Sequence, residues 1–379
     1  MKFTVQSNEL LRVLNALLKV IQKKNDLPIL DTVLLDCTED GRYTLTGASA
    51  ENMLVMTVDI VPEAGTSFRK VCFNAQQLQA VVAALPAQPV EISVGDNYAS
   101  TIRYQGGHLN LMSQHATLYP EPPHPAETKC AFWLPTAIFL PAVKSALPCS
   151  GHEDIRPQMS SVALDVSNEG VTFVATNTRV LYKYVYTHGM PFLTEGSPDM
   201  ILIPNTIAAA IEHPFRNAEK VFFSHDGRQL TLSTDEARFI IRDVEGRYPN
   251  YNSVIPQENP YHVTLPVRDL SAAIRRVSLM ASEDSRLVAF RKTDNELNLT
   301  AENADYGMSA CESLPTEDCT LPSGFAIGIN ASNILQLLGP ISTERVRIEF
   351  SGAERPMLFK EDATNSSLTE LAMPMKLNV

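Results

Sequence analysis

The sequence lacks the short motifs that mark common catalytic sites. It contains no GxSxG, GxxxxGKS/T, HExxH or GxGxxG. Its eight histidines are dispersed, and none lies at helical i,i+4 spacing from another. The acidic residues form no evident acid–base pair. We therefore expect a protein that is not an enzyme. The alternative, an unrecognised hydrolase, would reveal itself by turnover of a substrate.

Long apolar runs are also missing. No stretch approaches the roughly 18 residues that cross a bilayer, and the start, MKFTVQSNEL, lacks the apolar core of a signal peptide. The six cysteines are scattered, with no CxxC pair and no zinc-ligand spacing. These absences predict a cytoplasmic protein with reduced thiols, no membrane partner, no cofactor and no metal. A metal at His152-Glu153-Asp154 is the alternative, although one histidine beside two carboxylates in a loop is usually only solvated.

One sequence pattern is present six times. A short alternating apolar run ends at a polar residue or a proline, and an apolar helical pattern then begins. Copies start at Phe3, Phe132 and Val263, about 130 residues apart, and a second phrase of the same kind starts at Val71, Ile201 and Ala326. The repeats predict three similar domains, each made of two strand-helix-strand units.

Two proline-rich connectors divide the chain into predicted domains at residues 1–127, 128–257 and 258–379. The segment from Tyr119 to Pro125 holds four prolines in seven residues, and GRYPNYNSVIPQENP ends the second copy. Hairpin turns are predicted at Asp40-Gly41, Glu169-Gly170 and Asp226-Gly227. Alternating strands with only six helices predict an α+β fold, in which antiparallel sheets carry helices on one face.

Positive charge is scarce in total but concentrated locally. The formal net charge of −12 argues at first sight against a nucleic-acid partner. Yet the stretches around the first predicted helix of each copy carry eight basic residues and only two acidic ones. The basic residues are Arg12, Lys19, Lys23, Lys24, Lys144, Arg268, Arg275 and Arg276, and the acidic ones are Glu9 and Asp269. Either these are ordinary solvated helix faces, or they form a local surface that faces phosphate groups.

The repeat suggests a ring. If the three copies curve the same way, their helices line the inner face and their sheets lie outside, and two chains supply twelve helices. At about 10 Å per helix the opening is about 28 Å wide, which admits duplex DNA with a layer of water. Such a ring would hold DNA by enclosure and would need only weak, sequence-independent phosphate contacts.

Several short segments, spread over the whole chain, carry a family resemblance. They are MKFTV at the start, Leu27-Pro28-Ile29-Leu30, Thr44-Leu45-Thr46-Gly47, Arg156-Pro157, Val174-Ala175-Thr176, Gly246-Arg247-Tyr248-Pro249-Asn250-Tyr251 with Val254 and Pro256, and Met373-Pro374-Met375-Lys376-Leu377. In order and spacing the chain resembles the bacterial β sliding clamp family, the processivity subunits of DNA polymerase III. The resemblance implies a DNA-clamp fold and a head-to-tail homodimeric ring. It also implies that an ATP-driven clamp loader places the ring around double-stranded DNA.

The resemblance further implies a groove between the second and third domains that takes apolar peptides from the replicative polymerase and other proteins. Carried over position by position, the groove comprises Met159, Thr176, Thr178, Leu181, Pro249, Val254, Pro356, Met373, Pro374 and Met375. Methionines beside a proline-rigid wall make an adaptable apolar slot; alternatively, the terminal methionines only seal a strand. After Thr176 the family usually has an acidic residue, a small residue, His and Arg, whereas this chain has Asn177-Thr178-Arg179-Val180. Arg179 is therefore a further candidate, and the peptide preference is expected to differ.

For DNA, the resemblance points to Lys24 and to the loop that contains His152 and Arg156, and the charge count adds Arg12, Lys19, Lys23, Arg275 and Arg276. Asn205-Thr206 stand where the family often has basic residues, so weaker DNA contact is expected from the second copy. For the dimer, the resemblance points to Leu109 and Leu111 against Leu279 and Met280, which could equally be core residues. An exposed apolar edge strand is a liability unless paired, which favours a ring. The competing hypothesis is a clamp-like paralogue that binds peptides without encircling DNA.

Overall fold

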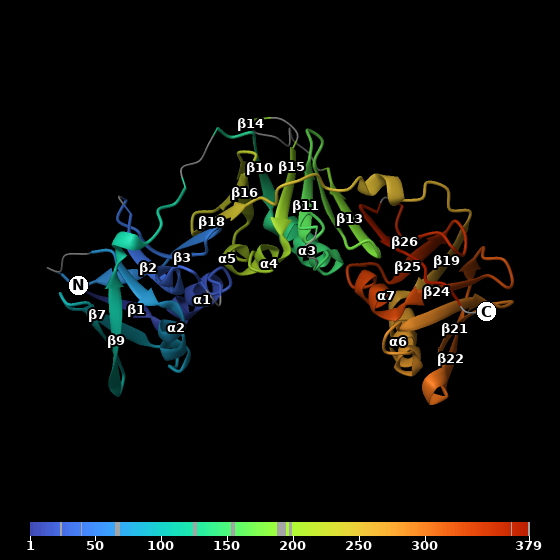
Figure 1. The fold of residues 1–379 in the computed structure, drawn as a ribbon, viewed down its shortest axis with the longest axis horizontal. Coiled ribbons are helices and arrows are strands. Elements are labelled where there is room, and N and C mark those ends of the chain that lie inside the picture. Colours follow the sequence, from blue (N-terminus) through green and yellow to red (C-terminus); the bar gives the residue numbers. More distant parts are fainter. Residues whose placement is uncertain are drawn as a thin grey trace. The chain divides into compact units, whose positions relative to one another are not determined.

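The computed structural model describes residues 1–22, 25–38, 40–64, 69–123, 127–152, 156–187, 195–196, 199–364 and 366–377. The chain folds into two compact units. Unit 1 comprises Met1–Leu140 with Pro191–Asp243, and unit 2 comprises Pro141–Met190 with Val244–Val379. Each unit therefore contains one terminal copy of the repeat and part of the middle copy (Figure 1). The three-domain division stays a prediction.

Unit 1 is organised around a long run of antiparallel strands. Their order is β14-β10-β16-β17-β18-β4-β3-β2-β6-β9-β8-β7-β1-β5. In chain order the elements are β1 (Lys2–Gln6), α1 (Ser7–Leu17), η1 (Pro28–Asp31), β2 (Thr32–Cys37), β3 (Tyr43–Ala48), β4 (Met53–Thr57), β5 (Ile60–Pro62), β6 (Val71–Asn74), α2 (Ala75–Ala83), β7 (Pro89–Val94), β8 (Ala99–Tyr104), β9 (Gly107–His115), η2 (Ala116–Leu118), β10 (Cys130–Pro135), β14 (Glu195–Gly196), β15 (Asp199–Pro204), α4 (Asn205–Ala208), α5 (Glu212–Phe215), β16 (Lys220–His225), β17 (Gln229–Ser233) and β18 (Ala237–Arg242). Helix α3 (Thr136–Ala146) begins in unit 1 and ends in unit 2.

Unit 2 contains two groups of antiparallel strands. One group has the order β11-β12-β13-β27-β26-β25-β19-β23 and the other β22-β21-β20-β24. In chain order the elements are η3 (Leu147–Cys149), β11 (Ser161–Val166), β12 (Val171–Thr176), β13 (Val180–Tyr186), η4 (Tyr251–Val254), β19 (Tyr261–Pro266), α6 (Val267–Val277), η5 (Ser278–Met280), β20 (Leu287–Lys292), β21 (Glu296–Asn303), η6 (Ala304–Tyr306), β22 (Met308–Pro315), β23 (Asp318–Cys319), β24 (Ala326–Asn330), α7 (Ala331–Leu337), β25 (Arg345–Phe350), β26 (Met357–Glu361) and β27 (Leu368–Ala372).

The repeated strand-helix phrase folds as predicted in the two terminal copies. Helix α6 buries Leu270, Ala273, Ile274 and Val277, which recur at i, i+3, i+4 and i+7 and so line one face. The second helices α2 and α7 both begin after an asparagine cap. Asn74 Oδ1 accepts the backbone N–H of residue 77 at 2.9 Å, and Asn330 Oδ1 accepts that of residue 333 at 3.1 Å.

The second helix of the middle copy is broken, which the sequence did not predict. Instead of one helix after Pro204, the chain forms α4 and α5, each of four residues. Pro214 has no N–H to donate to the carbonyl of Ala210, so one continuous helix from residue 205 would lack a hydrogen bond there. It is accommodated instead in the first turn of α5, where no N–H is required.

Helix α1 is also shorter than the apolar pattern around it. It ends at Leu17, and Val20 and Ile21 stay buried in a tight turn whose N–H groups donate to the carbonyl of Leu17. Burial of these two residues, rather than a continuing helix, explains the apolar periodicity there. The predicted cation Lys19 consequently lies beyond the helix end.

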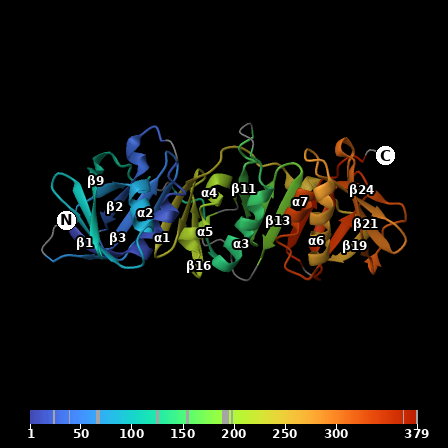
Figure 2. The same ribbon diagram turned by 90° about the horizontal axis from the view of Figure 1, so that it is seen from below.

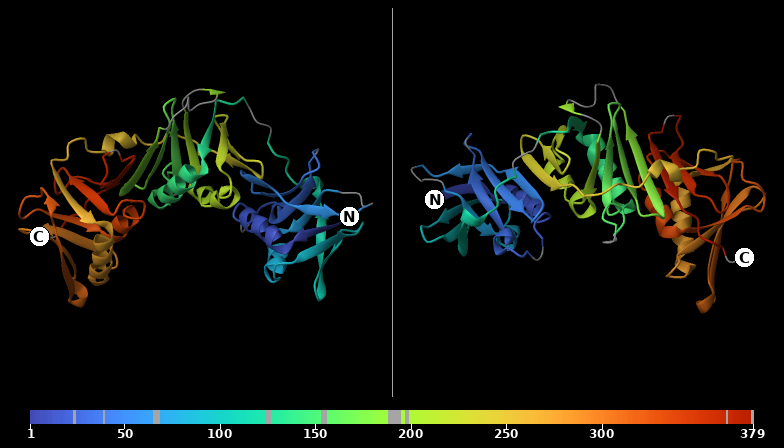
Figure 3. Two further views of the ribbon diagram at one scale, coloured as in Figure 1. Left: turned by 180° about the vertical axis from the view of Figure 1, so that it is seen from behind. Right: turned by 45° about the horizontal axis from the view of Figure 1, so that its top comes forward.

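Helices cover one face of the sheets in each unit, which confirms the predicted α+β arrangement (Figures 2 and 3). In unit 1, α1 packs against α2, and in unit 2, α6 packs against α7. Strand pairing also joins the copies: β18 pairs with β4 in unit 1, and β13 pairs with β27 in unit 2. Within the described residues, no helix is long and apolar enough to span a bilayer.

Candidate peptide groove, helix cations and sheet edges

The predicted peptide groove begins at the pairing of β13 with β27. Leu181 lies opposite Leu371, and Val180 lies opposite Ala372. The C-terminal segment extends this ladder, because Met373 N donates to Arg179 O at 2.8 Å. Two residues further on, Met375 N donates to Gly328 O at 2.7 Å. The segment from Met373 to Met375 therefore lies between Arg179, which directly precedes β13, and Gly328 of β24.

The loop that departs from the family pattern is a compact hairpin turn between β12 and β13. Asn177 Oδ1 accepts the backbone N–H groups of Arg179 and Val180, each at 3.0 Å. Thr176 Oγ1 donates to Val180 O at 2.7 Å. Thr178 adopts a φ of +72°, a conformation that is strained for a β-branched residue. The local hydrogen bonds of Asn177 and Thr176 hold this turn closed.

The connector after β18 carries the predicted groove residues Pro249 and Val254, and it crosses β11 to β13. Tyr251 Oη donates to Asp165 Oδ2 at 2.6 Å, and Lys183 Nζ donates to Asn252 Oδ1 at 2.9 Å. Burial raises the pKa of the Tyr251 phenol, and so does its bond to Asp165. These anchors position Pro249 and Val254. Sequence reasoning did not assign Tyr251 a role, although it lies within the GRYPNY segment.

The predicted groove residues divide into two classes by exposure. Leu181 and Met159 are buried and belong to the wall beneath the surface. Val254 is 48% exposed and Met373 is 39% exposed, so both offer apolar surface to a ligand. The remaining candidates are exposed or half-buried: Thr176, Thr178, Arg179, Pro249, Pro356, Pro374 and Met375.

A buried carboxyl group lies on β27, just before the terminal segment. Glu370 is fully buried opposite Tyr182 of β13, and neither carboxyl oxygen has a hydrogen-bond partner among the described residues. Burial raises the pKa of Glu370 well above its ordinary value, and the charge of Glu361 adds to this. The carboxyl group is therefore far easier to keep neutral than ionised.

Two of the predicted DNA-binding cations, Arg12 and Arg276, form ion pairs with carboxylates of this chain. Arg12 donates to both carboxylate oxygens of Glu9, at 3.0 and 2.8 Å. Arg276 Nε donates to Glu312 Oε2 at 3.0 Å, and its second nitrogen to Oε1. These bonds raise the pKa of both arginines, and Arg276 lowers the pKa of Glu312. Much of their charge is therefore compensated within the chain.

Two other predicted cations remain available to a ligand. Lys19 and Arg275 are exposed, and no carboxylate of the described residues lies within ion-pair distance of either. Arg275 lies in the last turn of α6, where the helix dipole favours a cation. His152 and Arg156 are exposed. Lys23 and Lys24 lie outside the described residues, as does the middle of the loop at 153–155.

The predicted dimer residues lie on the edge strand β9 and on η5, which lies beside the edge strand β22. Residues 107–112 of β9 pair with β8, whereas β6 reaches only Ser113 to His115. All eight residues of β22 pair with β21, and no described strand pairs with its other edge. Leu109 is 37% exposed on the first edge, and Leu279 of η5, beside β22, is 71% exposed. Leu111 and Met280 are half-buried, so none of the four is a fully buried core residue.

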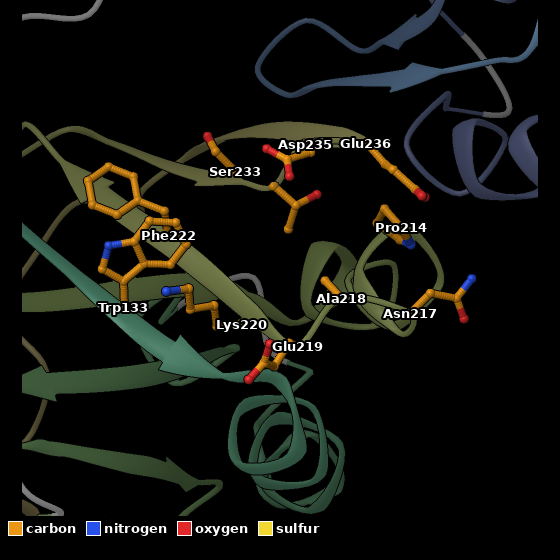
Figure 4. A pocket seen from close by; sticks show the side chains of 11 residues that line it. Trp133, Pro214, Asn217, Ala218, Glu219, Lys220, Phe222, Ser233, Asp235 and Glu236 are labelled. Carbon is orange, nitrogen blue, oxygen red and sulfur yellow. The ribbon is translucent and has the colours of Figure 1, made fainter.

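Unit 1 also has a surface cleft of about 510 Å3 that the sequence did not indicate (Figure 4). Trp133 of β10 and Phe222 of β16 pack at 5.0 Å between ring centroids, on the strand face opposite Phe132 and Phe223. Lys220 Nζ lies 4.6 Å from the centre of the Trp133 ring. None of the predicted site residues lines this cleft.

Comparison with known proteins identifies the family. The DNA polymerase III beta subunit N-terminal domain matches residues 1–123, and the C-terminal domain of the same subunit matches residues 252–376. Together these ranges cover well over half of the chain. The chain belongs to the DNA polymerase III beta subunit family. This confirms the family predicted from the sequence, whose members are sliding clamps of replication rather than catalytic subunits.

Two relatives and two solved structures match over 99–100% of both chains. The beta sliding clamp of Escherichia coli K12 is 24% identical over 382 residues, with 100% of both chains covered. That of Bacillus subtilis is 21% identical over 387 residues, covering 99% of this chain and 100% of the relative. A Pseudomonas aeruginosa sliding clamp bound to griselimycin superposes with a TM-score of 0.89 at 23% identity and 100% coverage of both chains. A Thermotoga maritima beta subunit gives 0.88 at 21% identity and 99% coverage. The DNA-clamp fold is thereby confirmed.

Proposed function

We propose that this chain is a DNA polymerase processivity factor that works as a homodimeric ring around duplex DNA. The observation that carries the proposal is the pair of open sheet edges on β9 and β22. A head-to-tail dimer would pair β9 of one chain with β22 of the other, twice, and would leave neither edge open. Leu109 and Leu279 would then be covered at each contact.

Enclosure rather than tight contact would hold the DNA. The compensated charges of Arg12 and Arg276 support this mode, because a ring needs few free cations on its helices. Arg275 and Lys19 would supply weak phosphate contacts that carry no sequence preference. Such contacts let the ring slide along the duplex.

The groove in unit 2 would tether the polymerase, the clamp loader and other partners. Its exposed apolar groups, Val254 and Met373, lie on segments fixed by the Tyr251–Asp165 bond and by the Met373–Arg179 backbone bond. A short apolar peptide would bury both side chains. The closed Asn177 turn and the exposed Arg179 would give this groove a peptide preference of its own.

The proposal is tested by primer extension on singly primed circular DNA with the cognate polymerase and loader. Addition of the chain should lengthen the product made in one binding event, and linear templates with open ends should benefit less. Product lengths that do not change when chain and loader are added together would contradict the proposal.

A second candidate is a clamp-like paralogue that binds peptides without enclosing DNA. The uncharged Asn205-Thr206 favour it, because they stand where the family often has basic residues and so leave fewer cations for phosphate in the middle copy. It predicts a monomer at micromolar concentration together with intact peptide binding. A dimer of the wild-type chain would eliminate it.

A further inference from the structure

Four side chains with metal-binding chemistry meet inside unit 1. Cys130 of β10 lies directly opposite His225 of β16 in the antiparallel pairing. Asp199 begins β15, and its Oδ2 lies 2.8 Å from His225 Nδ1. Asp243 follows β18, and its Oδ2 lies 3.3 Å from His225 Nε2. The sulfur of Cys130, a carboxylate oxygen of Asp199 and a ring nitrogen of His225 all lie within 4.8 Å of one another.

The cluster is enclosed but not sealed. Cys130 is fully buried, and the His225 side chain is only 2% exposed. The Asp199 side chain is 27% exposed, so the site opens toward solvent on that side. Backbone hydrogen bonds fix both carboxylates: Met200 N donates to Asp199 Oδ1 at 2.9 Å, and Leu202 N donates to Asp243 Oδ1 at 2.6 Å.

A second observation concerns the other ring nitrogen of His225. His225 Nε2 is buried without a hydrogen-bond partner among the described residues, although Asp243 lies within ion-pair distance. A buried ring nitrogen in this condition is rare, because polar groups removed from water are normally satisfied. The imidazole is thus held among three candidate ligands without fully satisfied hydrogen bonds of its own.

We propose that Cys130, Asp199 and His225 bind a single zinc ion. Thiolate sulfur, imidazole nitrogen and carboxylate oxygen are the three ligand types that zinc takes in proteins, and a water molecule would complete a tetrahedral site. His225 would bind through Nδ1, and its remaining ring proton would then lie on Nε2, facing Asp243. Metal-binding histidines usually donate the second ring N–H to a carboxylate in this way.

The rearrangement required is small. Zinc bonds of about 2.0–2.1 Å to nitrogen and oxygen place those atoms about 3.3 Å apart in a tetrahedral site. The observed 2.8 Å between His225 Nδ1 and Asp199 Oδ2 must therefore widen by about half an ångström. The sulfur must approach to about 3.6 Å of the other two ligands, given a zinc–sulfur bond of about 2.3 Å. Side-chain adjustment at Cys130 and Asp199 can supply both movements.

The ion would connect strands that are distant in sequence. Residues 130, 199 and 225 belong to β10, β15 and β16, so one ion would tie three strands of unit 1 together. Bound metal stabilises the folded state because the unfolded chain lacks the assembled site.

The test uses the full-length chain, treated with a chelator and then titrated with zinc against a chromophoric competitor. We expect one tightly bound zinc per chain, and at least 100-fold weaker binding after Cys130→Ser or Asp199→Asn. Asp243→Asn, which alters only the carboxylate facing the ring, should weaken binding about 10–100-fold. If Cys130→Ser misfolds, Asp199→Asn still tests the site, because Asp199 is partly exposed and its replacement disturbs the fold less.

Two further measurements separate this site from adventitious binding. Cobalt added in place of zinc should give a thiolate-to-cobalt charge-transfer band that disappears in Cys130→Ser. The matched controls Cys311→Ser and Cys319→Ser alter thiols outside the cluster and should leave stoichiometry, affinity and spectrum unchanged. Wild-type and Asp199→Asn chains with equal zinc affinity, a cobalt spectrum without the sulfur band, or loss of binding in a control variant would overturn the proposal.

Discussion

Replacing Leu109 by Asp should break the proposed ring. Leu109 lies on the open edge of β9, where the dimer would cover it against the partner's β22. Losing most of one leucine's burial and placing a carboxylate in the contact together cost about 2–4 kcal/mol per interface. A head-to-tail ring contains the substitution at both interfaces. Dissociation of the dimer should therefore become easier by about 4–8 kcal/mol, or about 10³–10⁶-fold in its dissociation constant.

Sedimentation or light scattering at micromolar concentration measures this effect directly. We expect the wild-type chain at twice the chain mass and Leu109→Asp at the mass of one chain. The matched control is Val61→Asp, since Val61 is a 69% exposed apolar residue on β5, a different edge strand of the same unit. Because Leu109 is partly exposed already, the variant should still unfold cooperatively, as a folded monomer does. A Leu109→Asp chain that stays dimeric, or a Val61→Asp chain that dissociates equally, would refute the edge-pairing account.

Three further predictions concern the groove, the helix cations and the buried carboxyl. Met373→Ala should weaken binding of an apolar polymerase peptide about 10–100-fold, measured by fluorescence anisotropy. Tyr306→Ala, at another exposed apolar position, should leave the affinity unchanged. Equal losses of affinity in the two variants would contradict the groove assignment. Arg275→Ala should lower the slope of log affinity against log salt for duplex DNA by about 0.9, whereas Arg291→Ala on strand β20 should leave it unchanged. Burial raises the pKa of Glu370 in the folded chain above its value in the unfolded chain. The contribution of this carboxyl group to stability is therefore complete below the unfolded-state pKa. As pH rises above that value, the contribution falls by up to about 1.4 kcal/mol per pH unit. Thermal melts should therefore show a smaller loss of stability from pH 5 to pH 8 in Glu370→Gln than in the wild type. If stability falls equally with pH in both chains, the predicted effect of Glu370 is wrong.

The regular part of the fold could be predicted because it depends on local patterns. Alternation identified the hairpins at Gly41, Gly170 and Gly227, where φ is positive in the structure and glycine is favoured. Helical periodicity identified α1, α2, α6 and α7. The same reasoning overextended α1 and missed the break between α4 and α5, because it counted apolar residues without testing the N–H that Pro214 lacks.

Side-chain pairing could not be predicted from local patterns. Counting charges treated Arg12 and Arg276 as free cations, but Glu9 and Glu312 hold them. The Glu9 partner is three residues away and follows from helical spacing, whereas Glu312 is 36 residues from Arg276 and becomes visible only when β22 lies beside α6. Tyr251 and Asp165, whose hydrogen bond fixes the connector of the predicted groove, are 86 residues apart.

The cluster around His225 was missed for the same reason. Its ligand types were all counted in the sequence, but residues 130, 199, 225 and 243 have no metal-binding spacing. Antiparallel pairing of β10 with β16 places Cys130 opposite His225. Asp199, at the start of β15, and Asp243, just after the end of β18, add the two carboxylates. The register of the strand pairing determines which of these side chains meet, and that register is set by contacts between residues far apart in the sequence.

Topological retention on DNA tests the central claim most directly. The chain, loaded onto nicked circular plasmid by its cognate loader, should stay bound through gel filtration in salt that disrupts simple electrostatic contacts. Cutting the plasmid once should release it, because a ring slides off a free end. Equal retention on circular and linear DNA, or none on either, would contradict enclosure as the basis of function.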